Sequence, residues 1–287
     1  MHDIFYFTDV HGQYDLYRAA MNFCMTQDPE CMVIYGGDAC DRGFDGYRIM
    51  QELLDNPQVI YLKGNHEDIF VHAAWFIMRD FHSEINDTNV HNYLSMCQVI
   101  DNYSAEVQLS LYNGGFRTLY DWMMDGMSSK FVSRVAALPI TFSYENLDFC
   151  HAGANYKIFK RAAKNEYNHD FVDKNDYSML LWDRNYISQG WKNNRICVFG
   201  HTPTPYIASK YYGADKSLSG AHPCAYNPDL DDRWMGKKID MDVGTCGSGK
   251  LYVLNCLTMK AYGFVDYDLY SYKFHDHDVE QNEVIQL

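Results

Sequence analysis

The sequence lacks the features that mark membrane proteins and disulfide-rich proteins. None of its 287 residues belongs to a run of about 18 apolar residues, the length that spans a bilayer, and Met1-His2-Asp3 lacks the basic start of a signal peptide. The nine cysteines are scattered and form no Cys-x-x-Cys pair, so neither a disulfide framework nor a cysteine zinc site is indicated. We expect a soluble, cytoplasmic protein whose cysteines are mostly reduced core residues.

Basic residues are also in deficit. Lys and Arg number 24 against 38 Asp and Glu, which gives a formal net charge of −14 spread along the chain. Because such a surface repels phosphate backbones, we expect no nucleic-acid partner, and nothing indicates a membrane partner. A small anionic substrate would need a local positive centre, which metal ions provide. With 47% apolar residues the chain can build a substantial core, and we expect a single domain over residues 1–287.

Short apolar runs alternate with helix-like patterns along the first part of the chain. Strands are predicted at 3–8, 31–36 and 58–62, and helices at 14–25, at 46–54 and from about Glu67. This rhythm implies parallel strands with crossover helices. Further strands are predicted at 147–150, 195–199, 238–241, 250–254 and 260–265. Short turns between several of these later runs favour antiparallel pairing, so the expected fold class is α/β, with two packed mixed β-sheets flanked by helices.

Two segments depart from this rhythm. Residues 70–130 have a largely helical pattern rich in aromatic side chains and methionine. Core packing is the favoured interpretation of this helical insertion, and a lid over an active site is the alternative. Residues 205–234 carry Pro, Gly, Asn and Asp without periodicity, which predicts a long loop or loop insertion.

Metal-capable side chains follow five of the predicted strands. They are Asp9, His11, Asp38, Asn65, His151 and His201. Ligands in α/β sheets collect beyond the carboxyl ends of the strands, so these residues can converge. Oxygen and nitrogen donors without sulfur suit Mn, Fe or Zn in an open site. Shared between two ions about 3.5–4 Å apart, with Asp38 as the bridge, the six ligands leave positions open for water and a phosphate oxygen.

Each of these features alone has a simpler interpretation. An Asp-x-His sequence is a common polar turn, and a single His at a strand end is often structural. Gly64-Asn65-His66-Glu67 can be a turn and helix start with Asn65 as the N-cap. The joint occurrence at five strand ends is what favours a metal site.

Five motifs together resemble one protein family. They are Asp9-Val-His-Gly-Gln-Tyr-Asp15, Gly37-Asp38-Ala-Cys-Asp41-Arg42-Gly43, Gly64-Asn65-His66-Glu67, His151-Ala-Gly153 and Gly200-His201-Thr202. In this order they look like the phosphoprotein phosphatase branch of the calcineurin-like metallophosphoesterases. Thr8, Lys63 and Ala152 stand where eukaryotic members usually have Gly, Arg and Gly. These departures favour a bacterial or phage-type relative over a close eukaryotic protein phosphatase.

The resemblance implies roles for individual residues. One metal ion would be held by Asp9, His11 and Asp38, and the second by Asp38, Asn65, His151 and His201, with Mn²⁺ the expected ion and Fe or Zn as alternatives. His66 would donate a proton to the leaving oxygen, with Asp41 orienting its imidazole. Arg42 and Arg184 resemble the family's phosphate clamps, because a guanidinium matches two phosphate oxygens at once.

The implied activity is metal-dependent hydrolysis of a phosphomonoester by an attacking water, with a phosphorylated protein or a small phosphoester as substrate. The finer expectation is a serine/threonine-type phosphoprotein phosphatase. A diadenosine polyphosphate hydrolase or another small-molecule phosphoester hydrolase is the first alternative. Asp41 counts against it, since those hydrolases typically resemble Ala-Arg-Gly at this place. A non-catalytic scaffold is the second alternative, and it would be expected to lose ligands that are present here.

Overall fold

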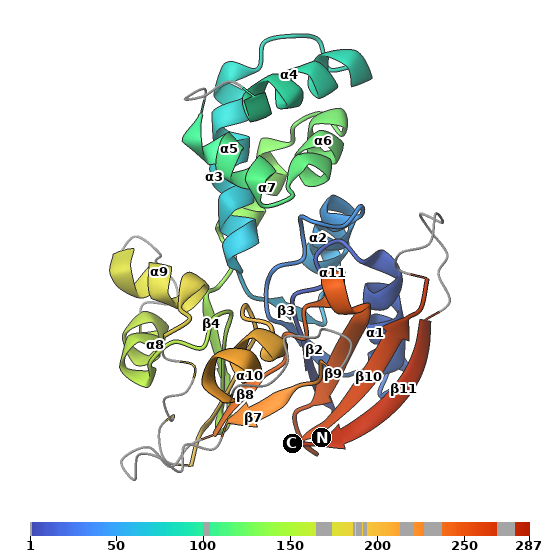
Figure 1. Cartoon of the computed structure of the whole chain (residues 1–287), viewed down its shortest axis with the longest axis vertical. Coiled ribbons are helices and arrows are strands. Elements are labelled where there is room, and N and C mark those ends of the chain that lie inside the picture. Colours follow the sequence, from blue (N-terminus) through green and yellow to red (C-terminus); the bar gives the residue numbers. More distant parts are fainter. Residues whose placement is uncertain are drawn as a thin grey trace.

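The computed structural model of the chain describes residues 2–99, 104–164, 174–185, 187, 191, 194–212, 221–226, 237–268 and 279–287. Two β-sheets pack together with helices along them, and a group of helices extends from one end of the sheets (Figure 1). Both chain termini lie at the opposite end. Within these ranges no helix is both long enough and apolar enough to cross a bilayer.

The first sheet has six strands in the order β11-β10-β9-β1-β2-β3. These strands are β1 Ile4–Phe7, β2 Met32–Tyr35, β3 Val59–Tyr61, β9 Lys250–Asn255, β10 Lys260–Asp266 and β11 Val279–Gln286. The strands β1, β2 and β3 are parallel, whereas β9, β10 and β11 join the other side of β1 in antiparallel pairs. The crossover helices are α1 Tyr14–Gln27 and α2 Gly46–Asp55. The predicted parallel β-α-β order of the first part of the chain is therefore present.

The second sheet has five strands in the order β4-β5-β6-β8-β7. These strands are β4 Thr141–Tyr144, β5 Leu147–Cys150, β6 Ile196–Phe199, β7 Cys224–Tyr226 and β8 Lys237–Asp240. The central strands β5, β6 and β8 are parallel, and the edge strands β4 and β7 pair antiparallel to them. Two mixed sheets flanked by helices are thus confirmed.

Alternating side chains of β1 explain how the two sheets pack. Phe5 and Phe7 point into the core shared with the helices, whereas Ile4 and Tyr6 point into the core between the sheets. The ring of Tyr6 stacks on that of Phe149 from the second sheet, with centroids 5.5 Å apart. Burial on both faces is why β1 is continuously apolar in sequence.

Five helices follow β3 and build the part that extends from the sheets in Figure 1. They are α3 Asn65–Asp80, α4 Asp87–Val99, α5 Ala105–Tyr112, α6 Phe116–Met124 and α7 Ser129–Ala136. The ring of Phe70 in α3 contacts those of Trp122 and Phe131, with centroids 5.7 and 5.9 Å apart. These buried rings belong to the same apolar cluster as Phe7 of the first sheet. The aromatic stripe of this segment is therefore used in packing.

The remaining elements include one departure from the predicted organisation. They are α8 Tyr156–Ala163, α9 Lys174–Trp182, α10 Thr204–Tyr212 and α11 Thr245–Ser248. The segment 205–234, predicted as a loop, instead begins inside α10 and contains β7. Pro205 lies in the first turn of α10, where its missing N–H has no helical partner to lose. Residues 213–220 and 227–236 of this segment lie outside the described residues.

Candidate active site and metal centre

The candidate residues lie on turns that directly follow the strands, and several of these turns have unusual backbone conformations. Left-handed φ values occur at Asp9 (56°), His11 (48°), Asp38 (59°), Asp41 (67°), Arg42 (66°) and His201 (72°). This conformation is disfavoured for residues with a Cβ and gathers where the surrounding structure holds functional side chains in place.

Backbone hydrogen bonds tie these turns together. The N–H groups of Asp9 and His11 donate to the carbonyls of Gly37 and Asp38, each at 3.0 Å. In the second sheet the N–H of Gly200 donates to the carbonyl of His151 at 2.9 Å. The turns after β1 and β2 therefore form one unit, and those after β5 and β6 form another.

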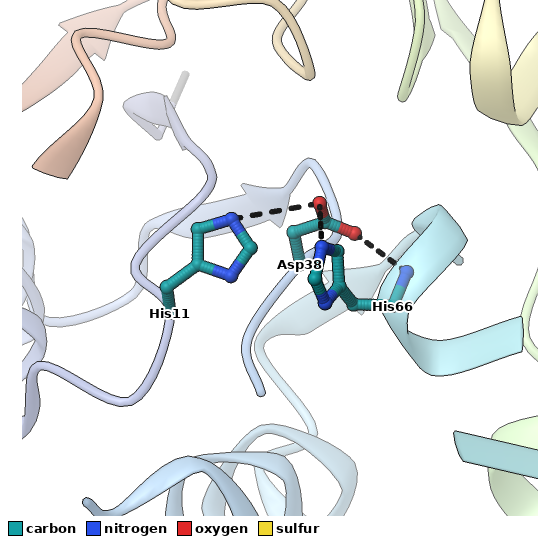
Figure 2. Close-up of side chains that lie close together, drawn as sticks. All are labelled: His11, Asp38 and His66. Carbon is teal, nitrogen blue, oxygen red and sulfur yellow. Dashed lines mark hydrogen bonds and ion pairs between the residues drawn. The ribbon is translucent and has the colours of Figure 1, made fainter. Parts of the chain in front are cut away.

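Asp38 lies at the centre of the first group of candidate ligands (Figure 2). Its Oδ2 is 3.7 Å from His11 Nε2 and 3.9 Å from His66 Nε2. Its Oδ1 accepts a hydrogen bond from the backbone N–H of His66 at 3.0 Å. All three side chains are buried, and their ligand atoms lie within 4.8 Å of one another. This spacing allows a cation to lie between Asp38 and His11, with the His66 imidazole beside it.

The second group lies on the other side of the same carboxylate. Asp38 Oδ1 is 3.3 Å from His151 Nε2. The Oδ1 of Asn65 lies 3.0 Å from His151 Nε2 and 2.9 Å from His201 Nδ1. Among the described residues, the buried Nε2 of His201 has no hydrogen-bond partner. Carboxylate, amide and imidazole donors this close together fit a divalent metal ion.

Asp9 lies next to these groups and makes its own set of hydrogen bonds. Its carboxylate accepts hydrogen bonds from the backbone N–H of His201, at 3.1 and 3.2 Å, and from the Thr8 hydroxyl at 2.7 Å. It belongs to neither of the two ligand groups found within the described ranges, and His66 accompanies His11 and Asp38 instead. Asp9 is nevertheless buried beside both groups, through its bonds to the turn that carries His201.

A buried histidine–carboxylate pair lies against the Asp38 cluster. His66 Nδ1 is 2.7 Å from Asp41 Oδ2, and both side chains are fully or almost fully buried. Arg42 Nη2 lies 3.0 Å from His66 Nε2. In the neutral imidazole, Nδ1–H donates to Asp41 and the guanidinium donates to Nε2, whereas in the imidazolium both ring nitrogens carry a proton. Three of the predicted catalytic residues are therefore in direct contact.

Arg184 lies apart from this group of three. Its Nη1 donates a 3.3 Å hydrogen bond to the hydroxyl of Thr202, the residue after His201. Its charge contributes to the lowered pKa of His201, after burial and the charge of His151. The structure thus places Arg184 beside the second group of candidate ligands and Arg42 beside the first.

Burial and charge shift the pKa values of these groups in opposite directions. Burial opposes the ionisation of Asp38, but His151 and His66 hold its pKa well below the usual value. Burial lowers the pKa of His151, but the Asp38 charge outweighs it and raises this pKa to about 10. Burial lowers the pKa of His66 as well, and Asp38 and Asp41 raise it overall. Asp38 is therefore an anion that favours the protonated form of these two histidines.

Burial is the main cause of the pKa shifts of the other buried groups near the site. Burial, followed by the charge of Arg42, keeps the pKa of His11 well below normal. For Asp9 burial raises the pKa to about 6, despite the opposing charge of His151. Burial and neighbouring carboxylates also raise the pKa values of Asp240 and Asp242, and Asp240 Oδ2 has no partner among the described residues. So many buried carboxylates in one place favour a bound cation, which would stabilise their charged forms.

Glu67 is a residue whose contribution the sequence did not reveal, since it was seen only as part of a motif. Its Oε2 accepts from the N–H groups of Asp38 and Gly64, both at 2.8 Å. Its Oε1 accepts from the Ala39 N–H and the Tyr61 hydroxyl, both at 2.7 Å. The one local signal is its position three residues after Gly64, the N-cap of α3, which is typical of a capping box.

Comparison with solved structures gives the following similarities. A cold-active protein tyrosine phosphatase has a similar structure, with a TM-score of 0.50 and 16% identity over 97% of this chain and 78% of that one. The structure of a candidate diadenosine tetraphosphatase has a TM-score of 0.49 and 12% sequence identity, over 98% of this chain and 94% of that one. The structure of a protein serine/threonine phosphatase from Saccharomyces cerevisiae has a TM-score of 0.44 and 15% sequence identity, over 89% of this chain and 73% of that one. At these identities the first similarity shows the fold alone.

A search among curated proteins gives no match. The model of one protein family, described as calcineurin-like phosphoesterase, matches residues 2–232, which is most of the chain. That range includes every candidate ligand and catalytic residue described above. The chain therefore belongs to the calcineurin-like phosphoesterase family, and it is a metal-dependent hydrolase of phosphoester bonds.

Proposed function

We propose that this hydrolase is a phosphomonoesterase of the phosphoprotein phosphatase type, which removes phosphate from serine or threonine side chains. One observation carries the proposal: the buried His66–Asp41 pair, 2.7 Å apart, lies against the Asp38 cluster. An alkoxide is a poor leaving group at neutral pH, so its release requires a proton donor at this place. A histidine held by a carboxylate can supply that proton.

The proposed metal sites share Asp38. Asp9, His11 and Asp38 would hold one divalent ion, and Asp38, Asn65, His151 and His201 would hold the other, with Mn²⁺ the expected ion. When bound, the two ions supply the Lewis acidity that lowers the pKa of the attacking water and neutralises phosphoryl charge. The buried oxygen and nitrogen donors around Asp38 support this assignment.

The protein's own groups would then position and protonate the substrate. Arg42 would bind two phosphate oxygens, and its 3.0 Å contact with His66 Nε2 supports a phosphoryl group lying next to that nitrogen. Arg184, which is beside His201, would act as a second clamp. As the P–O bond breaks, the electron pair goes to the leaving oxygen and His66 Nε2–H gives that oxygen its proton. Asp41 stabilises the imidazolium beforehand and fixes its tautomer.

The test is His66→Asn, assayed with two substrates of different leaving-group pKa. We expect kcat on a phosphoserine peptide to fall by about 10²–10⁴-fold, the usual contribution of a general acid. The fall on p-nitrophenyl phosphate should be far smaller, because a nitrophenolate departs without a proton. Metal content should equal that of the wild type, and Asp41→Asn should give a milder form of the same pattern.

The exposed His72 on the same helix supplies the matched control, His72→Asn, which should behave as wild type on both substrates. Equal slowing of His66→Asn on both substrates, or loss of its metal, would overturn the assigned role. A wild-type enzyme that prefers diadenosine tetraphosphate to the phosphopeptide by kcat/KM would instead support the dinucleotide hydrolase alternative.

A further inference from the structure

The helical segment that follows β3 reaches into the active site at one turn. Between α5 and α6 the chain turns at residues 113–115, against the turn that carries Asp41 and Arg42. The backbone N–H of Arg42 donates to the carbonyl of Gly114 at 3.0 Å. The backbone N–H of Asp41 donates to the hydroxyl of Thr118, also at 3.0 Å. Thr118 is 1% exposed, so its hydroxyl is shielded from water.

Asp41 and Arg42 need support of this kind. Both have left-handed backbone conformations, with φ of 67° and 66°, and neither is a glycine. This conformation brings Cβ close to the following carbonyl oxygen, so two such residues in succession relax unless the surrounding structure holds them. The two N–H groups of this strained pair both donate to the helical segment.

The turn at residues 113–115 and the turn that carries Asp41 and Arg42 also pack closely against each other. A Cβ on Gly114 would lie 3.0 Å from the Arg42 nitrogen, and a Cβ on Gly115 would lie 2.3 Å from Ser110 Oγ and 3.1 Å from Asp41 Oδ1. On the other side, a Cβ on Gly46 would lie 3.0 Å from Thr118 Oγ1. A side chain at any of these three glycines would crowd its neighbours, and Gly114 also has a positive φ of 87°, so the helices and the Asp41–Arg42 turn are fitted to each other.

We infer that Thr118 is a positioning residue for the acid catalyst, and that α5, α6 and their connecting turn are a working part of the active site. The inference rests on the proposed function of His66. Thr118 touches neither the phosphate nor the leaving group. It fixes the Asp41 backbone, and Asp41 in turn holds the Nδ1–H of His66 at 2.7 Å.

The inference predicts a specific kinetic signature. Without the Thr118 hydroxyl the Asp41 backbone can relax, and its carboxylate then moves away from His66. Proton donation suffers, whereas metal binding at Asp38 does not depend on this bond. A substrate that needs a proton on its leaving oxygen should therefore be affected, and a substrate that does not need one should be affected much less.

The experiment compares Thr118→Val, which keeps the shape but loses the hydroxyl, with Thr118→Ser, which keeps the hydroxyl. For Thr118→Val we expect kcat on a phosphoserine peptide to fall about tenfold, since small misplacements of catalytic groups have large effects, with about twofold or less on p-nitrophenyl phosphate. Thr118→Ser should restore the peptide activity. Thr88→Val, at an exposed threonine of α4, is the matched control and should equal the wild type.

Equal behaviour of the Val and Ser variants, or equal slowing on both substrates, would overturn the inference. A second measurement separates this outcome from failure of the proposed function. The His66 Nδ1–H proton, bonded to a carboxylate, should give a downfield proton NMR signal in enzyme loaded with diamagnetic Zn²⁺, without any turnover. That signal should shift or broaden in Thr118→Val and persist in Thr118→Ser. An unchanged signal in Thr118→Val would refute the positioning role even if His66 proved not to be the acid.

Discussion

Asp38 is the residue on which both groups of candidate ligands depend. Its Oδ1 faces His151 at 3.3 Å and its Oδ2 faces His11 at 3.7 Å, so each oxygen belongs to a different group. A carboxylate used in this way fits a bridge between two ions. Asp9, by contrast, has hydrogen bonds to Thr8 and to the backbone of His201 and lies outside both groups.

This difference predicts unequal losses of metal. Asp38→Asn should lose most of both ions, since one oxygen at each group becomes an uncharged amide atom, whereas Asp9→Asn should weaken the binding of one ion only, since Asp9 is the proposed ligand of that ion alone. Elemental analysis after dialysis measures the content. Asp55→Asn, at a side chain 71% exposed, provides the control. Equal losses in the Asp38 and Asp9 variants would argue against the bridge.

The raised pKa of His151 predicts how metal binding depends on pH. With its pKa raised to about 10, its imidazole is protonated near neutrality in the metal-free fold, whereas a metal ligand must be neutral. His11 and His201, whose pKa values are lowered, are already neutral. Binding should therefore release roughly one proton, and the affinity should fall about tenfold per pH unit from about pH 8 to about pH 6. Calorimetry in buffers of different ionisation enthalpy counts the protons, and an enthalpy independent of the buffer would exclude this coupling.

The same shift has a consequence for stability in the absence of metal. Because the folded-state pKa of His151 is raised, the stabilisation is complete below the pKa of an unfolded histidine and is lost as pH rises through about 10.

The residues proposed to bear the chemistry could be picked out from sequence because they lie in compact motifs. Asp41, Arg42 and His66 are in contact as their motifs suggested. The supporting contacts could not be found in this way. Thr118 is separated from Asp41 by 77 positions, and no local pattern marks a hydroxyl that bonds a distant backbone N–H. The bond from the His201 N–H to Asp9 is likewise set by tertiary packing, since it spans 192 positions.

Helix α3 is the element that positions two of the candidate site residues next to the strand ends of the first sheet. It begins at Asn65, so the candidate ligand and the candidate acid both lie in its first turn. Glu67 fastens that turn to the one after β2, because its carboxylate accepts from the backbone N–H groups of Asp38, Ala39 and Gly64. The carboxylate thus supplies an acceptor to the Gly64 N–H at the start of the helix and to two N–H groups of the turn after β2.

Glu67→Gln should therefore destabilise the protein as well as loosen the site. A glutamine amide has only one acceptor oxygen, so in either orientation its NH₂ faces a backbone N–H, and we expect the free energy of unfolding to fall by about 1–3 kcal/mol. Urea unfolding of chelated protein measures this change without a contribution from metal. Glu30→Gln, at a side chain 77% exposed, should leave it unchanged. Wild-type stability in Glu67→Gln would mean that the carboxylate bonds are dispensable.

Among the described strands, prediction succeeded at every interior strand and at one edge strand, β3. The strands β1, β2, β5, β6 and β8 are interior, bury side chains on both faces and appear in sequence as apolar runs. The three strands that were not predicted, β4, β7 and β11, all lie at sheet edges. Strand β11 is mostly polar and exposed, because it pairs on one side only and covers little of the core. The apolar pattern that would reveal such a strand is therefore absent.

The molecule as a whole combines a net charge of −14 with a site for an anionic substrate. The first sheet supplies Asp9, His11 and Asp38 at its strand ends, and the second sheet supplies His151 and His201. The site exists only where the two sheets meet, so it requires the complete fold. Burial and the charges of neighbouring carboxylates raise the pKa values of Asp9 and Asp242. Divalent cations would make the local charge positive, so that a phosphate could bind.

The most direct test is therefore a titration of chelated protein with Mn²⁺ that follows bound metal and p-nitrophenyl phosphate hydrolysis in the same samples. We expect the metal-free protein to be inactive and activity to appear as about two ions bind per chain, as in other two-metal sites. Mg²⁺ should restore less activity, because it prefers oxygen ligands and the site is rich in imidazole. Full hydrolysis by protein without metal, or activity that rises without any bound ion, would contradict a catalytic metal centre built around Asp38.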